Sequence, residues 1–390
     1  PSRRILPAAG SRVGASCPLQ ERESAHLARR RTPSRRILPA FGAPAGAPAA
    51  VVHRSESRRF GGPASGEAAG MDINQMTWAG RLTDAFPLPC DQPFTRALAR
   101  DAGVTRRQLD RLLAEGLIRR PIKGVYLGTH VGDSVALRAA CLRLVTPADC
   151  VVVDRHAGWL HGAPMVLAPN EHLELRPLSI FRPSGHGRLR NDISRSGERN
   201  LSTSDVIEVD GIAVTTQIRT AWDLGRVRWT DEAISGLDAM FRLNSFSREE
   251  FLAGIERFAG MRWVTTLRAV GPLADGRSES PGESVLRLRC HEANVPVVPQ
   301  VEVWRNEILL GRLDLGIEDL LQGFEYDGDE WHSSPEQRKH DRERRREISD
   351  NGWTIAALGC EEVFGRAREC DRIIRQAAHA ARVKRGSRPA

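Results

Sequence analysis

The chain has 390 residues, of which 41% are hydrophobic and 27% are charged. At roughly 100–200 residues per domain, this length predicts two or three globular domains. No stretch approaches about 18 consecutive apolar residues, which excludes a membrane-spanning helix. The seven cysteines show no CxxC pairs, so the sequence indicates neither a disulfide scaffold nor a zinc knuckle, and it predicts a cytoplasmic protein with reduced thiols.

The basic excess lies at the N-terminal end. Lys and Arg number 57 and Asp and Glu number 49, which gives a formal net charge of +8. Residues 1–70 contain twelve Arg, no Lys and four Glu, and these account for the whole excess. The rest of the chain is neutral overall, so any nucleic-acid binding there has to come from local basic patches.

Residues 1–70 have no helical or strand periodicity and are rich in Pro, Gly, Ala, Ser and Arg. The string PSRRILPA occurs at 1–8 and again at 33–40, and the first methionine is Met71. Such a composition buries too little apolar surface to offset the entropy of ordering. We expect a disordered or mis-called leader, with Met71 as the initiator. A disordered basic arm that touches DNA is the alternative.

Residues 71–132 are predicted to form a winged helix-turn-helix. Thr95 and Thr105 are candidate N-caps of two short helices, and a glycine follows each helix. The predicted elements are helices at 96–102 and 106–115 and wing strands at 117–119 and 124–127. The alternative is a helical hairpin used only for packing or partner contact.

Candidate DNA contacts lie on the second of these helices. Its exposed residues are of types that contact phosphates and base edges, namely Arg106, Arg107, Gln108 and Arg111. The order of helix, Gly, helix and then Leu-Ile-Arg…Gly-Val-Tyr resembles the N-terminal domain of AbiEi-type antitoxins. That resemblance implies DNA and a cognate toxin as partners.

Residues 133–270 are predicted to be an α/β scaffold. The strings at 157–162, 211–215 and 219–223 resemble the second part of the same AbiEi-type proteins. His156 and His161 lack nearby ligands at metal spacing, so we interpret both as structural histidines. We expect no chemistry in this segment.

A Gly, Ser and Pro-rich stretch at 271–282 predicts a linker, which is followed by a domain at 283–382. The predicted elements there are a helix at 283–292 and strands at 297–304, 308–317 and 322–327. A short basic tail, 383–390, ends the chain.

Strand alternation predicts a cluster of carboxylates. On one strand, Leu313, Leu315 and Ile317 should share a face and leave Asp314 on the other. Glu325 and Asp327 should point the same way on the next strand, so a hairpin can place them beside Asp314. Three such carboxylates repel one another unless they share protons, hydrogen bonds or a cation, and Mg²⁺ (or Mn²⁺) suits them. A polar, solvent-facing side of the sheet is the alternative.

This acidic pattern resembles the PD-(D/E)xK restriction-endonuclease fold, and the string FEYDGDEWH at 324–332 resembles its very-short-patch-repair (Vsr-like) branch. The resemblance implies that Asp314 and Glu325 bind the metal and that Glu283 is the helix acid. Asp327 stands where the wider family has Lys, which puts catalysis in doubt. His332 matches a second histidine of the Vsr-like branch and is the candidate base.

A basic run at 338–346 follows this string. Candidate phosphate contacts there are Arg338, Lys339, Arg344 and Arg345, and Lys339 could replace the missing Lys. A merely solvated helix face is the alternative. Zinc is not predicted, because Cys290, Cys360 and Cys370 lack ligand spacing.

Together these observations predict a mixed α/β and α+β multidomain protein: a winged helix-turn-helix, a middle α/β scaffold and a C-terminal restriction-endonuclease-like α/β/α domain. The predicted function is Mg²⁺-dependent endonucleolytic hydrolysis of DNA in defence, repair or a toxin–antitoxin setting. The predicted partners are DNA and a toxin or repair protein. The alternative is a non-catalytic, antitoxin-like DNA-binding regulator that retains a nuclease scaffold.

Overall fold

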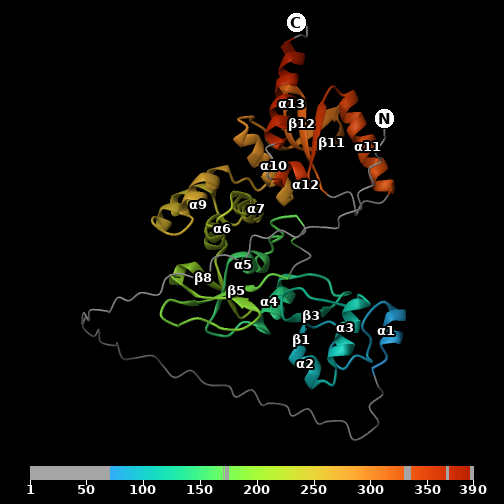
Figure 1. Cartoon of the computed structure of the whole chain (residues 1–390), viewed down its shortest axis with the longest axis vertical. Coiled ribbons are helices and arrows are strands. Elements are labelled where there is room, and N and C mark those ends of the chain that lie inside the picture. The colour runs from blue at the N-terminus through green and yellow to red at the C-terminus, as the bar shows by residue number, and fades with distance from the viewer. Residues whose placement is uncertain (1–70, 170, 172–174, 329–334, 366–368, 387–390) are drawn as a thin grey trace, which may run out of the picture. The chain divides into compact units, whose positions relative to one another are not determined.

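A computed structural model describes residues 71–390 except 170, 172–174, 329–334, 366–368 and 387–390 (Figure 1). For residues 335–338 the description is limited to the backbone. The predictions for the leader 1–70, for His332 and for the Arg338 side chain therefore lie outside the described residues. Within the described ranges, no helix has the length and apolar character needed to cross a membrane.

The N-terminal part of the described chain combines short helices with an antiparallel sheet of order β1-β3-β2. Its elements are α1 (Ile73–Ala79), β1 (Phe94–Thr95), α2 (Arg96–Asp101), α3 (Arg106–Ala114), β2 (Ile118–Arg119) and β3 (Val125–Gly128). The predicted caps are present, because the hydroxyls of Thr95 and Thr105 accept hydrogen bonds from the first turns of α2 and α3. The two helices and the two short strands after them lie within one residue of the predicted ranges.

The middle part contains a mixed six-stranded sheet of order β6-β5-β4-β9-β8, with β7 also paired to β5. Its strands are β4 (Val151–Val152), β5 (Leu178–Pro183), β6 (Ser194–Arg195), β7 (Glu198–Arg199), β8 (Val206–Val209) and β9 (Ile212–Thr215). Its α-helices are α4 (Val135–Arg143), α5 (Asp154–Leu160), α6 (Gln217–Gly225), α7 (Thr230–Phe241), α8 (Arg248–Gly254) and α9 (Val264–Val270). The rings of His156 and His161 hydrogen-bond to the backbone of Ser179 and Thr215, as expected of structural histidines.

The C-terminal part has three layers, with α11 on one face of a four-stranded sheet and α10 and α13 on the other (Figure 1). The elements are α10 (Pro281–Glu292), β10 (Val298–Arg305), β11 (Ile308–Ile317), β12 (Gln322–Asp327), α11 (Pro335–Asp350), β13 (Thr354–Gly359), α12 (Cys360–Phe364) and α13 (Glu369–Gly386). The strand order is β10-β11-β12-β13, and only the β12–β13 pair is parallel. The α/β/α layering agrees with the predicted class.

The stretch predicted as a linker, 271–282, is packed into the protein. Gly271, Ala274 and Ser278 are buried. One hydrophobic core runs from α6 and α7 of the middle part to α10, β12 and α13 of the C-terminal part. This stretch therefore has the composition of a linker but is buried like a part of the core. Its small residues allow the neighbouring helices to pack closely.

The alternation predicted for β11 is wrong at one position. Leu315 packs with Phe324 on the face covered by α10 and α13, whereas Leu313 packs with Val301 and Ile348 on the α11 face. The physical reason lies on the neighbouring strand, where Gln300 has φ +58° and interrupts the extended backbone opposite Asp314. Asp314 therefore lies at the position where the inward-facing side chains of β11 change from one face of the sheet to the other.

Candidate functional site

Asp314 lies where β11 and β12 separate. The last backbone pair between these strands is Leu315 with Phe324, and one step further the Asp314 Oδ2 atom accepts a hydrogen bond from the Tyr326 backbone N–H at 2.8 Å. A carboxylate thus takes the place of a backbone acceptor in the ladder. Its position is held by the strands on both sides.

Glu283, at the start of α10, lies near Asp314. A side chain at Gly282 would lie 2.2 Å from the ring of Tyr326, so only glycine allows the first turn of α10 to come this close to β12. Glu283, the next residue, is buried, and its Oε2 atom accepts hydrogen bonds from the Glu279 backbone N–H (2.8 Å) and the Gln300 side chain (2.7 Å).

The pKa of Asp314 is raised to about 7, first by burial and then by the neighbouring carboxylates of Glu283 and Glu325. The hydrogen bond from Tyr326 and the charge of Arg344 act in the opposite direction. Burial and like charges both disfavour the ionised form. The carboxylates of Glu283 and Glu325 therefore lie close enough to Asp314 to act on its charge.

Glu325 is neutralised by arginines of α11. Its side chain is 3% exposed, and Arg344 and Arg345 contact its two oxygens at 3.0 and 2.7 Å. Arg345 also reaches Asp327 at 3.2 Å. Glu325 and Asp327 do point the same way, as predicted, but Asp327 is held in this ion-pair group with Arg345 and not beside Asp314.

Two arginines of the basic run on α11 form ion pairs with a carboxylate of the sheet. Arg344 and Arg345 are oriented toward the sheet carboxylates, so these two side chains are engaged and are not free phosphate contacts. Lys339 is 72% exposed and lies 3.8 Å from Glu343. It extends from the helix surface, and no contact places it near Asp314.

A cation has no ready set of ligands in this arrangement. Among the described residues, no three His, Cys, Asp or Glu side chains are grouped so that they could hold a metal ion. Glu325 could ligate one only after Arg344 and Arg345 have moved away, because these guanidiniums already neutralise it. The magnesium ion at Asp314 and Glu325 stays a prediction.

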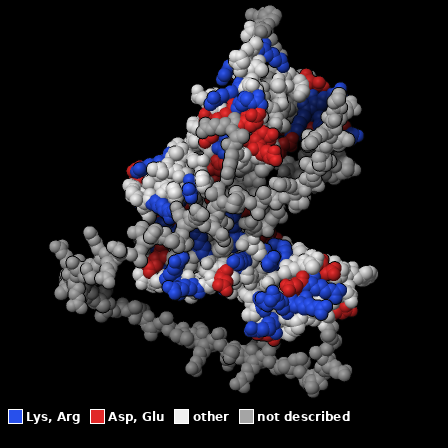
Figure 2. Space-filling view, viewed as in Figure 1, with Lys and Arg blue, Asp and Glu red and all other residues white. Residues whose placement is uncertain are grey.

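Helix α3 presents its arginines unequally. Arg107 is exposed and forms no ion pair among the described residues, and Arg106 is exposed with Asp110 at a distant 3.7 Å. Gln108 caps its own helix, since its Oε1 atom accepts a hydrogen bond from the Thr105 backbone N–H. Arg111 donates to Asn74 of α1. Figure 2 shows basic side chains gathered over α2 and α3, with acidic ones between them.

The two arginines at the start of α3 are therefore the strongest candidates for nucleic-acid contact.

Residues 92–127 match the family model of the AbiEi antitoxin transcriptional regulators. The match runs from just before β1 into β3 and includes the whole of α2 and α3. This segment, called the AbiEi-type segment below, confirms the resemblance predicted from its helix and wing pattern.

Similarity to other proteins extends well beyond this segment. Two uncharacterized proteins of Mycobacterium tuberculosis, MT2308 from strain CDC 1551 and Rv2248 from strain H37Rv, are each 29% identical over 261 residues. The aligned region is 67% of this chain and 92% of each relative. The resemblance of residues 283–382 to nucleases stays a prediction.

Sequence reasoning missed a charged cluster in the middle part. The carboxylate of Asp223 is 1% exposed and contacts three guanidiniums, those of Arg199 (3.0 Å), Arg219 (2.9 Å) and Arg226 (2.8 Å). One signal was available, because Arg219 and Asp223 are four residues apart on a helix of otherwise apolar character. Gln300, which holds Glu283, had no comparable signal.

Proposed function

We propose that the chain is a DNA-binding transcriptional regulator in a toxin–antitoxin setting, with the AbiEi-type segment as a winged helix-turn-helix. The observation that carries the proposal is the match of residues 92–127 to antitoxin regulators, where two capped helices lie between the first and second strands of a short sheet. A cognate toxin is the second partner implied by that family.

The contacts with DNA are assigned to the start of α3. Arg106 and Arg107 are exposed there and are not held by short ion pairs, so both are available for phosphate oxygens or guanine edges. Gln108 caps α3 and Arg111 holds α1, so both have structural roles. Phosphate contacts of this type dominate affinity and make it depend on salt.

The first prediction concerns these two arginines. We expect the double substitution Arg106→Ala and Arg107→Ala to weaken binding to a mixed-sequence DNA duplex. The slope of log affinity against log salt should become shallower by roughly one unit per lost phosphate contact. Fluorescence anisotropy at several salt concentrations measures both quantities.

Arg305→Ala, which removes an exposed arginine at the end of β10, is the matched control and should change neither quantity. An unchanged affinity and slope in the double variant would reject α3 as the DNA-contacting helix.

A second candidate function is hydrolysis of phosphodiester bonds at the C-terminal carboxylates. It is favoured by one observation, the raised pKa of Asp314 between Glu283 and Glu325. Functional carboxylates are commonly perturbed in this way. A divalent cation at Asp314 and Glu325 would supply electrophilic activation of the phosphate.

The second prediction tests this activity. With Mg²⁺ or Mn²⁺ at millimolar concentration, wild-type protein should gain thermal stability and cleave DNA, because a ligand that binds only the native state stabilises it. Asp314→Asn should lose both responses, whereas Asp319→Asn, on a side chain that is 90% exposed, should keep them. Absence of cation binding and of cleavage in the wild type would leave the carboxylates with a structural role and only the regulator function.

A further inference from the structure

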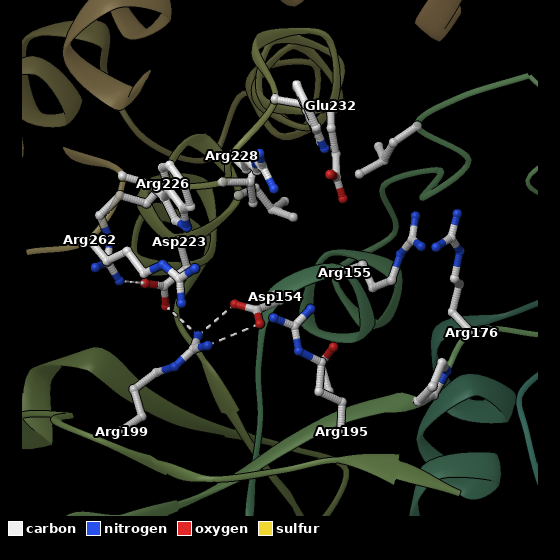
Figure 3. A pocket seen from close by; sticks show the side chains of 17 residues that line it. Asp154, Arg155, Arg176, Arg195, Arg199, Asp223, Arg226, Arg228, Glu232 and Arg262 are labelled. Carbon is white, nitrogen blue, oxygen red and sulfur yellow. Dashed lines mark hydrogen bonds and ion pairs between the residues drawn. The ribbon is translucent and has the colours of Figure 1, made fainter. Parts of the chain in front are cut away.

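The middle part of the chain contains a cavity of about 610 Å³ that no function above uses. Its walls come from the start of α5, from β6 and β7, from the end of α6 and from the turns before α7 and α9 (Figure 3). Binding sites for small molecules commonly enclose roughly 300–1,000 Å³. The size therefore suits one small molecule.

The lining of this cavity is strongly basic. Seven arginines line it against three carboxylates; the arginines are Arg155, Arg176, Arg195, Arg199, Arg226, Arg228 and Arg262, and the acids are Asp154, Asp223 and Glu232. Arg155 and Arg176 share one further carboxylate, that of Glu171. The excess of positive charge favours an anion with several negative charges.

A network of ion pairs lies beneath the cavity, in which Arg219 is shared between Asp223 (2.9 Å) and Asp205 (2.8 Å). Asp223 serves three guanidiniums at once, and Arg199 is shared between Asp223 (3.0 Å) and Asp154 (2.5 Å). The Nε atom of Arg226 is buried and makes no hydrogen bond. The same guanidinium pairs with Asp223 and lies 4.6 Å from the centre of the Phe258 ring.

Three arginines at the mouth have no carboxylate partner among the described residues. Arg195, Arg228 and Arg262 are exposed, and within the described ranges none of them forms an ion pair. In Figure 3 the labelled arginines surround one opening, from several sides. Guanidinium groups bind phosphate oxygens in a bidentate manner, which makes phosphate the best match among anions.

Aromatic surface lies beside these charges. Trp229 is 62% exposed and Trp263 also lines the cavity. The guanidiniums of Arg228 and Arg262 lie 4.7 and 4.9 Å from the centres of the respective rings, which fixes the arginines and indoles together. A flat aromatic base is the group that such a wall would accommodate.

The backbone is strained at two points of the same lining. Asp154 has φ +51° and Trp263 has φ +63°, both in the left-handed region that glycine favours. Strain of this type is unfavourable in itself and is concentrated at functional sites, where the surrounding structure maintains it. Two such residues on one cavity indicate a built site.

We propose that this cavity binds a nucleoside di- or triphosphate, with the phosphates on the arginines and the base against the tryptophan wall. Several phosphates match the charge excess, and the base matches the aromatic and apolar part of the lining. The proposal is independent of DNA binding by α3 and of the C-terminal carboxylates.

Isothermal titration calorimetry of the full chain tests the proposal with ATP, pyrophosphate, adenosine and a single-stranded oligonucleotide. ATP should bind most tightly, pyrophosphate more weakly, and adenosine not measurably at the same concentrations. Arg195→Gln with Arg262→Gln should weaken ATP binding by about 30-fold, since two charge-assisted contacts are lost. Arg81→Gln with Arg305→Gln, which removes two exposed arginines elsewhere, should leave it within about twofold of the wild type.

Three results would overturn the proposal: equal ATP affinity in the two double variants, pyrophosphate binding as tightly as ATP, or oligonucleotide binding that Arg195→Gln with Arg262→Gln weakens as much as it weakens ATP binding. The last result would identify the cavity as part of a nucleic-acid surface. If Arg195→Gln with Arg262→Gln lowers the melting temperature, Arg228→Gln serves as a second variant, because the Arg228 side chain is exposed. It should also weaken ATP binding.

Discussion

Replacement of Asp223 by Asn is expected to lower the free energy of unfolding by about 3–5 kcal/mol, the cost of leaving buried charge without its partner. The carboxylate is almost fully buried and accepts from three guanidiniums, all of them mostly buried and that of Arg219 the most. Asn keeps the volume and one acceptor but removes the negative charge. Urea unfolding followed by circular dichroism measures the change.

Asp192→Asn is the matched control, because Asp192 is exposed and forms no ion pair among the described residues. It should change stability by less than about 0.5 kcal/mol. Adding Arg226→Gln to the Asp223→Asn variant should recover part of the loss, since one unbalanced positive charge is removed with the negative one. A single variant as stable as the wild type would mean that the cluster is hydrated and its charges are screened.

The parts of the fold that depend on neighbours in the sequence were predictable. Thr95 and Thr105 cap the helices that follow them, and strand β12 occupies the predicted residues 322–327. Caps and alternation act over a few residues, so composition and spacing contain the information. The AbiEi-type segment was recognised for the same reason.

The candidate sites depended on longer-range packing. The side chains of β11 change from one face of the sheet to the other at Asp314, opposite the left-handed backbone of Gln300 on β10. No local sequence pattern predicts a left-handed backbone at a glutamine. Arg345 reaches Glu325 only because α11 packs on the face that Glu325 occupies. The sequence therefore indicated that Asp314 and Glu325 lie near each other, while the position of Asp327 and the arginines that neutralise Glu325 followed from the tertiary fold.

The middle cluster shows the same limit. The ion pairs of Asp223 reach α6 itself, the turn after it and strand β7, and Asp154 joins from α5. The pairs of Asp223 with Arg219 and Arg226 have helical spacing, whereas Arg199 and Asp154 come from elements far away in the sequence. The absence of metal-ligand spacing in the segment was interpreted as an absence of chemistry, yet arginines need no fixed spacing to line a cavity.

Asp314→Asn is expected to make the protein more stable above neutral pH and to remove a pH dependence from its unfolding. Burial and the carboxylates of Glu283 and Glu325 raise the pKa of Asp314 from 3.8 to about 7 in the folded state. Between about pH 4 and pH 7, the folded state therefore retains a proton on Asp314 that the unfolded chain has already released. Stability associated with this group is full below about pH 4 and falls as the pH rises through that window.

The asparagine side chain has no proton to release and can still accept the hydrogen bond from the Tyr326 backbone N–H. Relative to the wild type, Asp314→Asn should thus gain up to about 4 kcal/mol by pH 8 and little at pH 4, because each tenfold difference in proton affinity between the folded and unfolded states corresponds to about 1.4 kcal/mol. Urea unfolding at steps from pH 4 to pH 8 measures the difference. Asp319→Asn, on a side chain that is 90% exposed, should follow the wild type throughout. If Asp314→Asn also ran parallel to the wild type, the Asp314 carboxylate would be ionised at neutral pH without penalty, and crowding by Glu283 and Glu325 could no longer support a functional carboxylate site.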